Sequence, residues 1–184
     1  ADEVSYLLSD SEAKALIVHA DLWRKIAADI PRDVLDGILI LIVETSDDIA
    51  KAFRVPARDC PLPAGMTEWR SWLSQFPEWD GPPPKPRYAT IYTSGTTGRP
   101  KGVKRSGDVV PTQTGKATAY VQGARTLMLA PMYHAAPNRN AVSSFFAGGD
   151  IVLQARFDPE EMLRLIDQHR ITNLFIVPTM MVRL

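Results

Sequence analysis

The sequence predicts an α/β fold: a largely parallel β-sheet with helices on both faces. Two apolar runs of strand length, residues 14–19 and 37–43, lie on either side of a helix-like segment. Continuous apolar strands are typical of parallel sheets that are buried on both faces, and parallel strands need a crossover between them. Strands and helices alternate again after residue 125, as expected for one α/β architecture.

Helical spacing of apolar residues defines the early helices. Residues 2–12 carry such a pattern, with polar residues between the apolar ones. A second helix is expected to be capped by Asp21 and ended by Pro31. Its apolar face consists of Leu22, Trp23, Ile26 and Ile30.

Residues 56–87 form a proline-rich connecting segment that is expected to be mostly irregular. A short helix is expected inside it, because four apolar residues fall at i, i+3, i+4 and i+7. These are Trp69, Trp72, Leu73 and Phe76. The aromatic stripe favours core packing over a ligand platform. Residues 81–86 are typical of an extended polyproline linker.

The second half carries three further expected strands, at residues 126–130, 151–153 and 171–177. A helix over residues 140–147 is expected to be closed by Gly148 and Gly149. Asp158, followed by a proline and two glutamates, is a strong helix start.

Composition excludes several classes of protein. The length of 184 residues suggests a single domain, residues 1–184, and the 21 basic and 21 acidic residues give no support for a nucleic-acid partner. One cysteine, Cys60, excludes a disulfide framework and favours a reducing, cytoplasmic location. The longest apolar run, residues 38–43, is too short for a transmembrane segment. No His, Asp and Glu set has metal-ligand spacing, so no structural metal is expected.

The most informative stretch follows an expected strand over residues 88–92. It supplies hydroxyls and glycines in the order Thr93, Ser94, Gly95, Thr96, Thr97 and Gly98. Cations follow at Arg99, Lys101, Lys104 and Arg105. Glycines let backbone N–H groups turn toward an anion, hydroxyls add donors, and a lysine adds a mobile charge. The pattern favours polyphosphate binding over an ordinary surface turn.

Two common phosphate-binding motifs do not fit this stretch. The Walker motif requires Gly-Lys-Ser/Thr, but Pro100 occupies the glycine position and Gly102 the hydroxyl position. The dinucleotide motif G-x-G-x-x-G also fails, because Gly95 and Gly98 are spaced differently.

Residues 93–102 closely resemble the signature of the adenylate-forming superfamily, hydroxyl-Ser-Gly-Thr-Thr-Gly-x-Pro-Lys-Gly. This superfamily contains the acyl-CoA synthetases, the luciferases and the adenylation domains of peptide synthetases. Residues 129–137 are similar to its next motif, which contains a histidine matched by His134, and residues 175–179 to a third. The resemblance covers most of the chain and is weakest over residues 108–122. The family has a helix over residues 106–121, and a poorly defined one is expected here.

The resemblance implies that the parent protein activates a carboxylic acid with ATP and transfers it to coenzyme A. Residues 93–98 would embrace the phosphates, Lys101 would add positive charge, and Thr93 or Thr97 would help to orient Mg²⁺. His134 would line the acyl side. Its place after a strand, at the edge where α/β sheets bind ligands, supports that role. The histidines at positions 19 and 169 suit structural roles, and Asn138 is a weaker candidate for the same pocket as His134.

The chain departs from the family pattern by ending before the adenine and ribose motifs and the small C-terminal lid domain. It is therefore expected to be an excerpt of the large N-terminal domain and inactive alone. No aspartate occurs between Pro137 and Gly149, which favours an acyl-CoA synthetase over a peptide-synthetase domain. The apolar run over residues 141–149 suits a fatty-acyl or aryl tail.

A non-catalytic nucleotide-binding module is the alternative reading, and a phosphotransferase using a Walker variant is a weaker one. The resemblance is compatible with a homodimer, and the oligomeric state is open.

Overall fold

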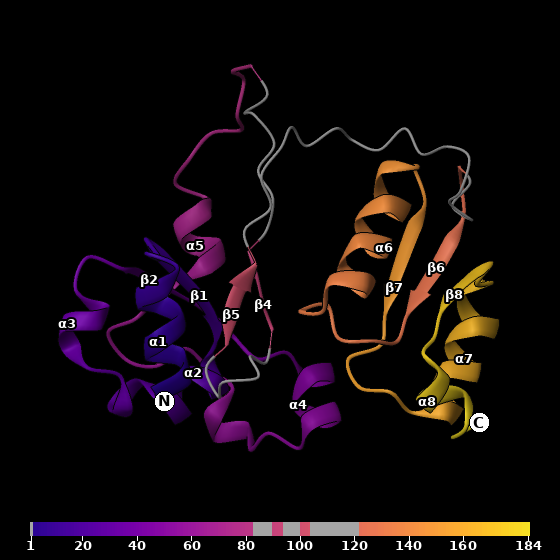
Figure 1. The fold of residues 1–184 in the computed structure, drawn as a ribbon, viewed down its shortest axis with the longest axis horizontal. Coiled ribbons are helices and arrows are strands. Elements are labelled where there is room, and N and C mark those ends of the chain that lie inside the picture. The colour runs from indigo at the N-terminus through magenta and orange to yellow at the C-terminus, as the bar shows by residue number, and fades with distance from the viewer. Residues whose placement is uncertain (1, 83–89, 94–99, 104–121) are drawn as a thin grey trace. The chain divides into compact units, whose positions relative to one another are not determined.

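The computed structural model describes residues 2–82, 90–93, 100–103 and 122–184 (Figure 1). The chain divides into two compact units, Ala1–Arg105 and Ser106–Leu184, and each is described by itself. The helix expected over residues 106–121 and the start of the strand expected at residue 88 lie outside the described residues.

The first unit contains a parallel sheet in the order β1-β2-β3 and a separate antiparallel hairpin of β4 and β5. Its strands are β1 (Ala15–His19), β2 (Leu39–Val43), β3 (Thr67–Glu68), β4 (Ile91–Thr93) and β5 (Lys101–Val103). Its α-helices are α1 (Asp2–Asp10), α2 (Ala20–Ile26), α3 (Arg32–Leu35), α4 (Asp47–Phe53) and α5 (Trp69–Leu73). Two 3₁₀ turns occupy Ala27–Asp29 and Ala57–Asp59.

The core of the first unit lies between the sheet and its first two helices. Ile42 of β2 is fully buried and shares a cluster with Leu8 of α1 and Trp23 of α2. Leu41 is also buried, and neighbouring strand residues point to opposite faces. This confirms the prediction from the continuous apolar run that β2 is covered on both faces.

The prediction that Asp21 caps the second helix is wrong. His19 occupies the N-cap position, and Asp21 lies inside the helix, where it is buried. Its carboxylate accepts a hydrogen bond from the Thr45 hydroxyl at 2.8 Å and one from Lys25 at 3.3 Å. Asp21 therefore bonds to Thr45, on the segment after β2, instead of capping its own helix.

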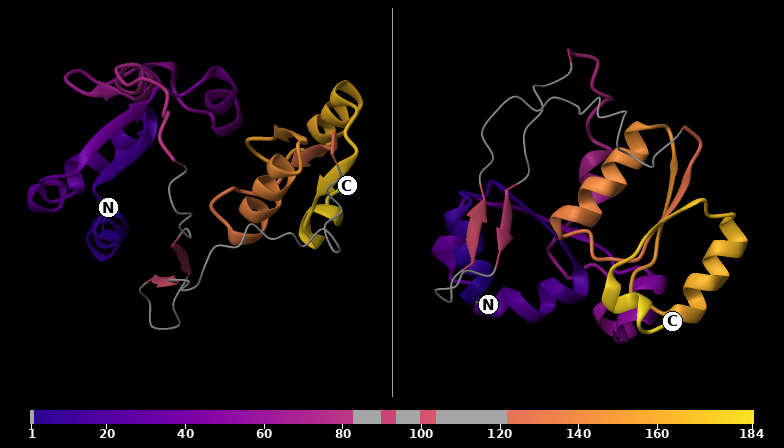
Figure 2. Two further views of the ribbon diagram at one scale, coloured as in Figure 1. Left: turned by 90° about the horizontal axis from the view of Figure 1, so that it is seen from above. Right: turned by 45° about the vertical axis from the view of Figure 1, so that its right-hand side comes forward.

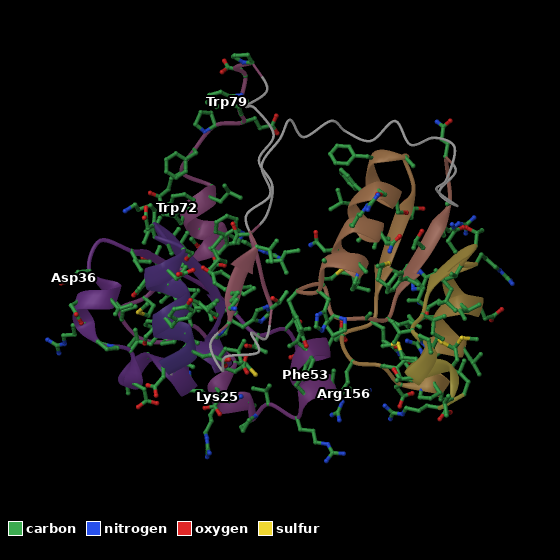
Figure 3. The ribbon with its side chains drawn as sticks, in the orientation of Figure 1. Lys25, Asp36, Phe53, Trp72, Trp79 and Arg156 are labelled. Carbon is green, nitrogen blue, oxygen red and sulfur yellow. The ribbon has the colours of Figure 1, made fainter. Side chains whose placement is uncertain are left out.

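The proline-rich segment is more regular than its composition indicates. It contributes β3, which pairs in parallel with β2, and α5, which confirms the expected helix. Glu68 caps α5 by accepting a hydrogen bond from the Ser71 N–H at 2.6 Å. Core packing of the aromatic stripe is not observed, because no residue of α5 is buried and Phe76 is 54% exposed. Trp72 and Trp79 are marked in Figure 3.

The second unit contains a parallel sheet in the order β7-β6-β8, which is labelled in Figure 1 and coloured orange to yellow in Figure 2. Its strands are β6 (Arg125–Met128), β7 (Asp150–Leu153) and β8 (Asn173–Phe175). Its helices are α6 (Ala135–Phe146), α7 (Pro159–His169) and α8 (Pro178–Met181). These bounds confirm the three strands that were expected from the sequence.

Helices cover both faces of this second sheet. Thr126 of β6 faces α6, where its hydroxyl lies 2.8 Å from that of Ser144. Leu127, which points to the opposite face, packs with Met162 and Leu165 of α7. The fold class expected from the sequence is therefore confirmed in the arrangement of β6.

The ends of the helices in the second unit follow from local chemistry. Asp158 caps α7 by accepting the Glu161 N–H at 2.9 Å, as its sequence predicts. Helix α6 starts at Ala135, earlier than the predicted residue 140. Pro137 is tolerated there because backbone N–H groups of a first helical turn have no partner within the helix.

Candidate functional site

Two of the candidate phosphate-binding residues, Thr93 and Lys101, lie on a short β-hairpin. β4 and β5 are antiparallel, with Ile91 opposite Val103, Tyr92 opposite Gly102, and Thr93 opposite Lys101 (Figure 1). The return strand β5 was not predicted, because a lysine, a glycine and a valine carry no strand pattern. The sequence between Thr93 and Lys101 therefore connects two paired strands.

This pairing brings two predicted site residues together. Directly opposed residues of an antiparallel pair project to the same face, so the side chains of Thr93 and Lys101 share one face of the hairpin. Both residues are exposed. A hydroxyl and an ammonium group thus stand at the two ends of the connecting loop, as phosphate oxygens would require. The predicted residues Ser94, Gly95, Thr96, Thr97 and Gly98 lie outside the described residues.

The opposite face of the hairpin is formed by Tyr92 and Gly102. A Cβ atom placed on Gly102 would lie 3.0 Å from Cζ of Tyr92, so the ring crosses the glycine closely. The Tyr92 hydroxyl donates a hydrogen bond of 2.6 Å to the Asp10 carboxylate at the end of α1. This bond raises the pKa of Tyr92 to about 12. Sequence analysis missed this pair, which has no local signal because 82 positions separate its members.

His134 lies in the second unit, after the central strand β6. It is the N-cap residue of α6, and its backbone carbonyl accepts the Asn138 N–H at 3.2 Å. The imidazole makes no capping hydrogen bond, is exposed, and lies 4.6 Å from the Tyr133 ring between centroids. The side chain is thus available at the carboxyl end of a parallel sheet, where ligands bind in open α/β folds.

His134 and Asn138 lie one helical turn apart and share a face of α6. The other two histidines occupy different places. His19 is the N-cap residue of α2, and His169 is the last residue of α7, where its carbonyl accepts a hydrogen bond from Arg125 at 3.2 Å. His134 belongs to a different unit from Thr93 and Lys101, so their joint action stays a prediction.

The hairpin residues would supply only a small share of the oxygen ligands of a bound Mg²⁺ ion. Thr93 offers one exposed hydroxyl oxygen, and Mg²⁺ prefers oxygen ligands that include substrate phosphates and water. Within the described ranges, no three His, Cys, Asp or Glu side chains come together as metal ligands would. Most of the coordination would therefore come from the nucleotide.

Comparison with known proteins places the whole chain in one family. The model of the AMP-binding enzymes matches residues 1–184. The medium/long-chain-fatty-acid–CoA ligase FadD8 of Mycobacterium tuberculosis is 36% identical over 107 residues, covering 54% of this chain and 18% of the relative. A medium/long-chain-fatty-acid–CoA/3-oxocholest-4-en-26-oate–CoA ligase of Mycolicibacterium smegmatis is 29% identical, covering 98% of this chain and 34% of the relative.

Solved structures agree in fold. ATP-bound MatB from Rhodopseudomonas palustris has 26% sequence identity and a TM-score of 0.64, and the match covers 99% of this chain and 33% of that chain. The N-terminal domain of FACL13 from Mycobacterium tuberculosis has 24% identity and a TM-score of 0.62, and the match covers 97% of this chain and 41% of that chain. The chain thus spans 18% and 34% of the length of the two curated relatives.

Proposed function

Because this chain belongs to the AMP-binding enzyme family, we propose that the protein activates a carboxylic acid with ATP and transfers the acyl group to coenzyme A. The observation that carries the proposal is the register of the β4–β5 hairpin. It sets Thr93 opposite Lys101, at the two ends of a loop of glycines and hydroxyls. The relatives named as CoA ligases support the same activity.

In the first step, a carboxylate oxygen of the acid attacks the α-phosphorus of ATP. A new P–O bond forms, the bond from the α-phosphorus to its bridging oxygen breaks, and pyrophosphate leaves. In the second step, the thiol of coenzyme A loses its proton to solvent, its sulfur attacks the acyl carbonyl carbon, and AMP leaves with the bonding electron pair. Both reactants of the first step are anions, so charge neutralisation and positioning are the main tasks of the site.

The chain's own residues would divide these tasks. The ammonium of Lys101 would neutralise phosphate charge, while Thr93 and residues 94–98 would donate hydrogen bonds to the β- and γ-phosphates. Bound Mg²⁺ would spread the remaining phosphate charge, with Thr93 or Thr97 helping to hold it. His134 would line the acyl side and orient the carboxylate.

The acid is proposed to be apolar, either fatty or aryl. Helix α6 carries Val142, Phe145 and Phe146, which are 45%, 68% and 79% exposed in the described unit. Exposed apolar side chains on the helix whose N-cap is His134 suit an acyl tail, because binding would remove both apolar surfaces from water. The names of the two relatives, both ligases of medium- and long-chain fatty acids, agree with this class.

Both structural units are proposed to be parts of one N-terminal domain, with the proline-rich residues 56–87 as a connecting segment within the first unit. Support comes from the family model, which spans residues 1–184 without a break at residue 105. Among the helices that the structure describes, none is long and apolar enough to cross a bilayer. A cytoplasmic location is proposed on the single free cysteine, Cys60, while a homodimer stays a prediction.

The test is acid-dependent exchange of labelled pyrophosphate into ATP by the full-length protein. The acid panel should contain acetate, medium and long fatty acids, aryl acids and amino acids. Exchange with fatty or aryl acids, and formation of AMP when coenzyme A is added, is the expected result. ATP binding without exchange for any acid would favour the non-catalytic nucleotide-binding module, and ADP as product would favour a phosphotransferase.

A further inference from the structure

The hairpin that carries Thr93 and Lys101 is small. Among the residues that the structure describes, it consists of three residue pairs, and β4 and β5 form a sheet of their own. An isolated two-stranded hairpin is marginally stable in water. A phosphate loop that must hold donors in place therefore needs support from elsewhere in the fold.

Tyr92 makes a contact that connects the hairpin to another element of the fold. Its ring lies on the face of the hairpin opposite Thr93 and Lys101, and its hydroxyl reaches the Asp10 carboxylate at 2.6 Å. Tyr6 donates a second, longer hydrogen bond of 3.4 Å to the other oxygen of the same carboxylate. A single acidic side chain therefore connects the first helix to the phosphate hairpin.

Asp10 lies at a position where a carboxylate needs hydrogen-bond donors. It is the last residue of α1, and the last turn of that helix contains no basic residue. A carboxylate near the C-terminus of a helix is disfavoured by the helix dipole. The tyrosine hydroxyls supply the donors that such a carboxylate needs, since a hydrogen bond to a charged group is stronger than one between neutral groups.

The contact made by Tyr92 also explains why position 102 is a glycine. A Cβ at this position would lie 3.0 Å and 3.1 Å from two ring carbons of Tyr92, and 3.3 Å from Cγ2 of Thr90. The glycine therefore provides the space in which the ring crosses β5. Without that space, the ring and its hydroxyl would have to move away from the glycine.

We propose that Tyr92 and Asp10 are positioning residues, which fix the phosphate hairpin against α1 so that Thr93 and Lys101 meet the phosphates of ATP. This inference rests on the proposed function. Neither residue touches the nucleotide in this scheme. The hydroxyl of Tyr92 acts through the strand, because Tyr92 and Thr93 are consecutive residues of β4.

The test compares ATP binding by the full-length protein and its variants Tyr92→Phe, Asp10→Asn and the double variant, using equilibrium dialysis of labelled ATP. Each single variant is expected to weaken ATP binding by about two- to tenfold, the range of one hydrogen bond. The double variant should bind no more weakly than the weaker-binding single variant, because both changes act on the same hydrogen bond. The KM for the carboxylic acid should not change.

Two control variants keep the measurement specific. Asp167→Asn makes the same chemical change at an exposed helical residue of α7, and Tyr6→Phe removes the longer bond to Asp10 while keeping the one from Tyr92. Both control variants should bind ATP with close to wild-type affinity. A spectrophotometric titration of the tyrosines tests the contact itself, since Asp10→Asn should lower the pKa of Tyr92.

The outcomes separate this inference from the proposed function. If the wild type binds ATP and exchanges pyrophosphate, but Tyr92→Phe and Asp10→Asn bind ATP equally well, the positioning role is wrong and the ligase proposal stands. If the wild type itself binds no ATP, both proposals are wrong. Additive losses in the double variant would also overturn the inference, because they would show two independent effects.

Discussion

The hydroxyls of Thr126 and Ser144 lie 2.8 Å apart in the interior of the second unit, where the two residues are 1% and 0% exposed. This buried hydrogen bond joins the central strand β6 to α6. His134, the candidate acyl-site histidine, is the N-cap residue of that same helix.

We expect Thr126→Val to lower the free energy of unfolding by about 1–3 kcal/mol, because the Ser144 hydroxyl would be left buried without its partner. Ser144→Ala should have a similar effect. The double variant should lose less than the sum of both, since the second change removes the unpaired group. Urea-induced unfolding of the protein measures all three values, and strictly additive losses would contradict the shared bond.

Gly149→Ala should be more damaging than Gly148→Ala, although the two glycines are neighbours. A Cβ on Gly149 would lie 2.6 Å from the Ala124 carbonyl oxygen and 3.0 Å from Oγ of Ser144. Such overpacking against backbone costs about 3 kcal/mol at the upper end of its range. Gly148 has a φ of +73° with only ordinary contact nearby, so alanine there costs about 1–2 kcal/mol. Thermal unfolding of both variants checks this order, and equal losses would argue against the close approach.

Asp158→Ala should lower the free energy of unfolding by about 1 kcal/mol, because it removes the cap of α7. Asp167→Ala on the same helix is the matched control. Asp167 is an exposed partner of Arg170, and exposed ion pairs contribute about 0.2–1 kcal/mol. Denaturant titration distinguishes them, and a larger loss at Asp167 would contradict the capping role.

Lys101→Ala should weaken ATP binding by about tenfold to a hundredfold, because a hydrogen bond to a charged group contributes about 1.5–3 kcal/mol. The control is Lys51→Ala, which removes an exposed lysine from α4 without touching the hairpin. Equilibrium dialysis of ATP measures both variants. Equal binding by Lys101→Ala and the wild type would remove Lys101 from the phosphate site.

The Tyr92–Asp10 pair predicts a loss of stability at high pH. Because the hydrogen bond raises the folded-state pKa of Tyr92 from 10 to about 12, the protonated hydroxyl is favoured by folding. Its contribution is fully present below pH 10 and is lost as the pH rises through 12. The stability difference between wild type and Asp10→Asn, measured by urea unfolding, should therefore narrow over this window. A difference that is constant with pH would contradict the contact.

Local patterns were sufficient for much of the fold. The apolar run of β2 and the capped start of α7 depend on neighbouring residues, so the sequence predicted both correctly. The cap assigned to Asp21 failed because its carboxylate is taken by Thr45, 24 positions away. β5 escaped prediction because Lys101, Gly102 and Val103 form a strand only through pairing with β4.

The candidate site was likewise only partly predictable from the sequence. The sequence by itself determined the family and predicted the chemistry of the candidate phosphate loop, because glycines, hydroxyls and a lysine in that order are a local property of the chain. Only the tertiary structure decided that Thr93 faces Lys101 and that Tyr92 reaches Asp10. Those contacts join residues that are distant along the chain, and they exist only where folding brings the segments together and offsets the entropy of closing the intervening loops.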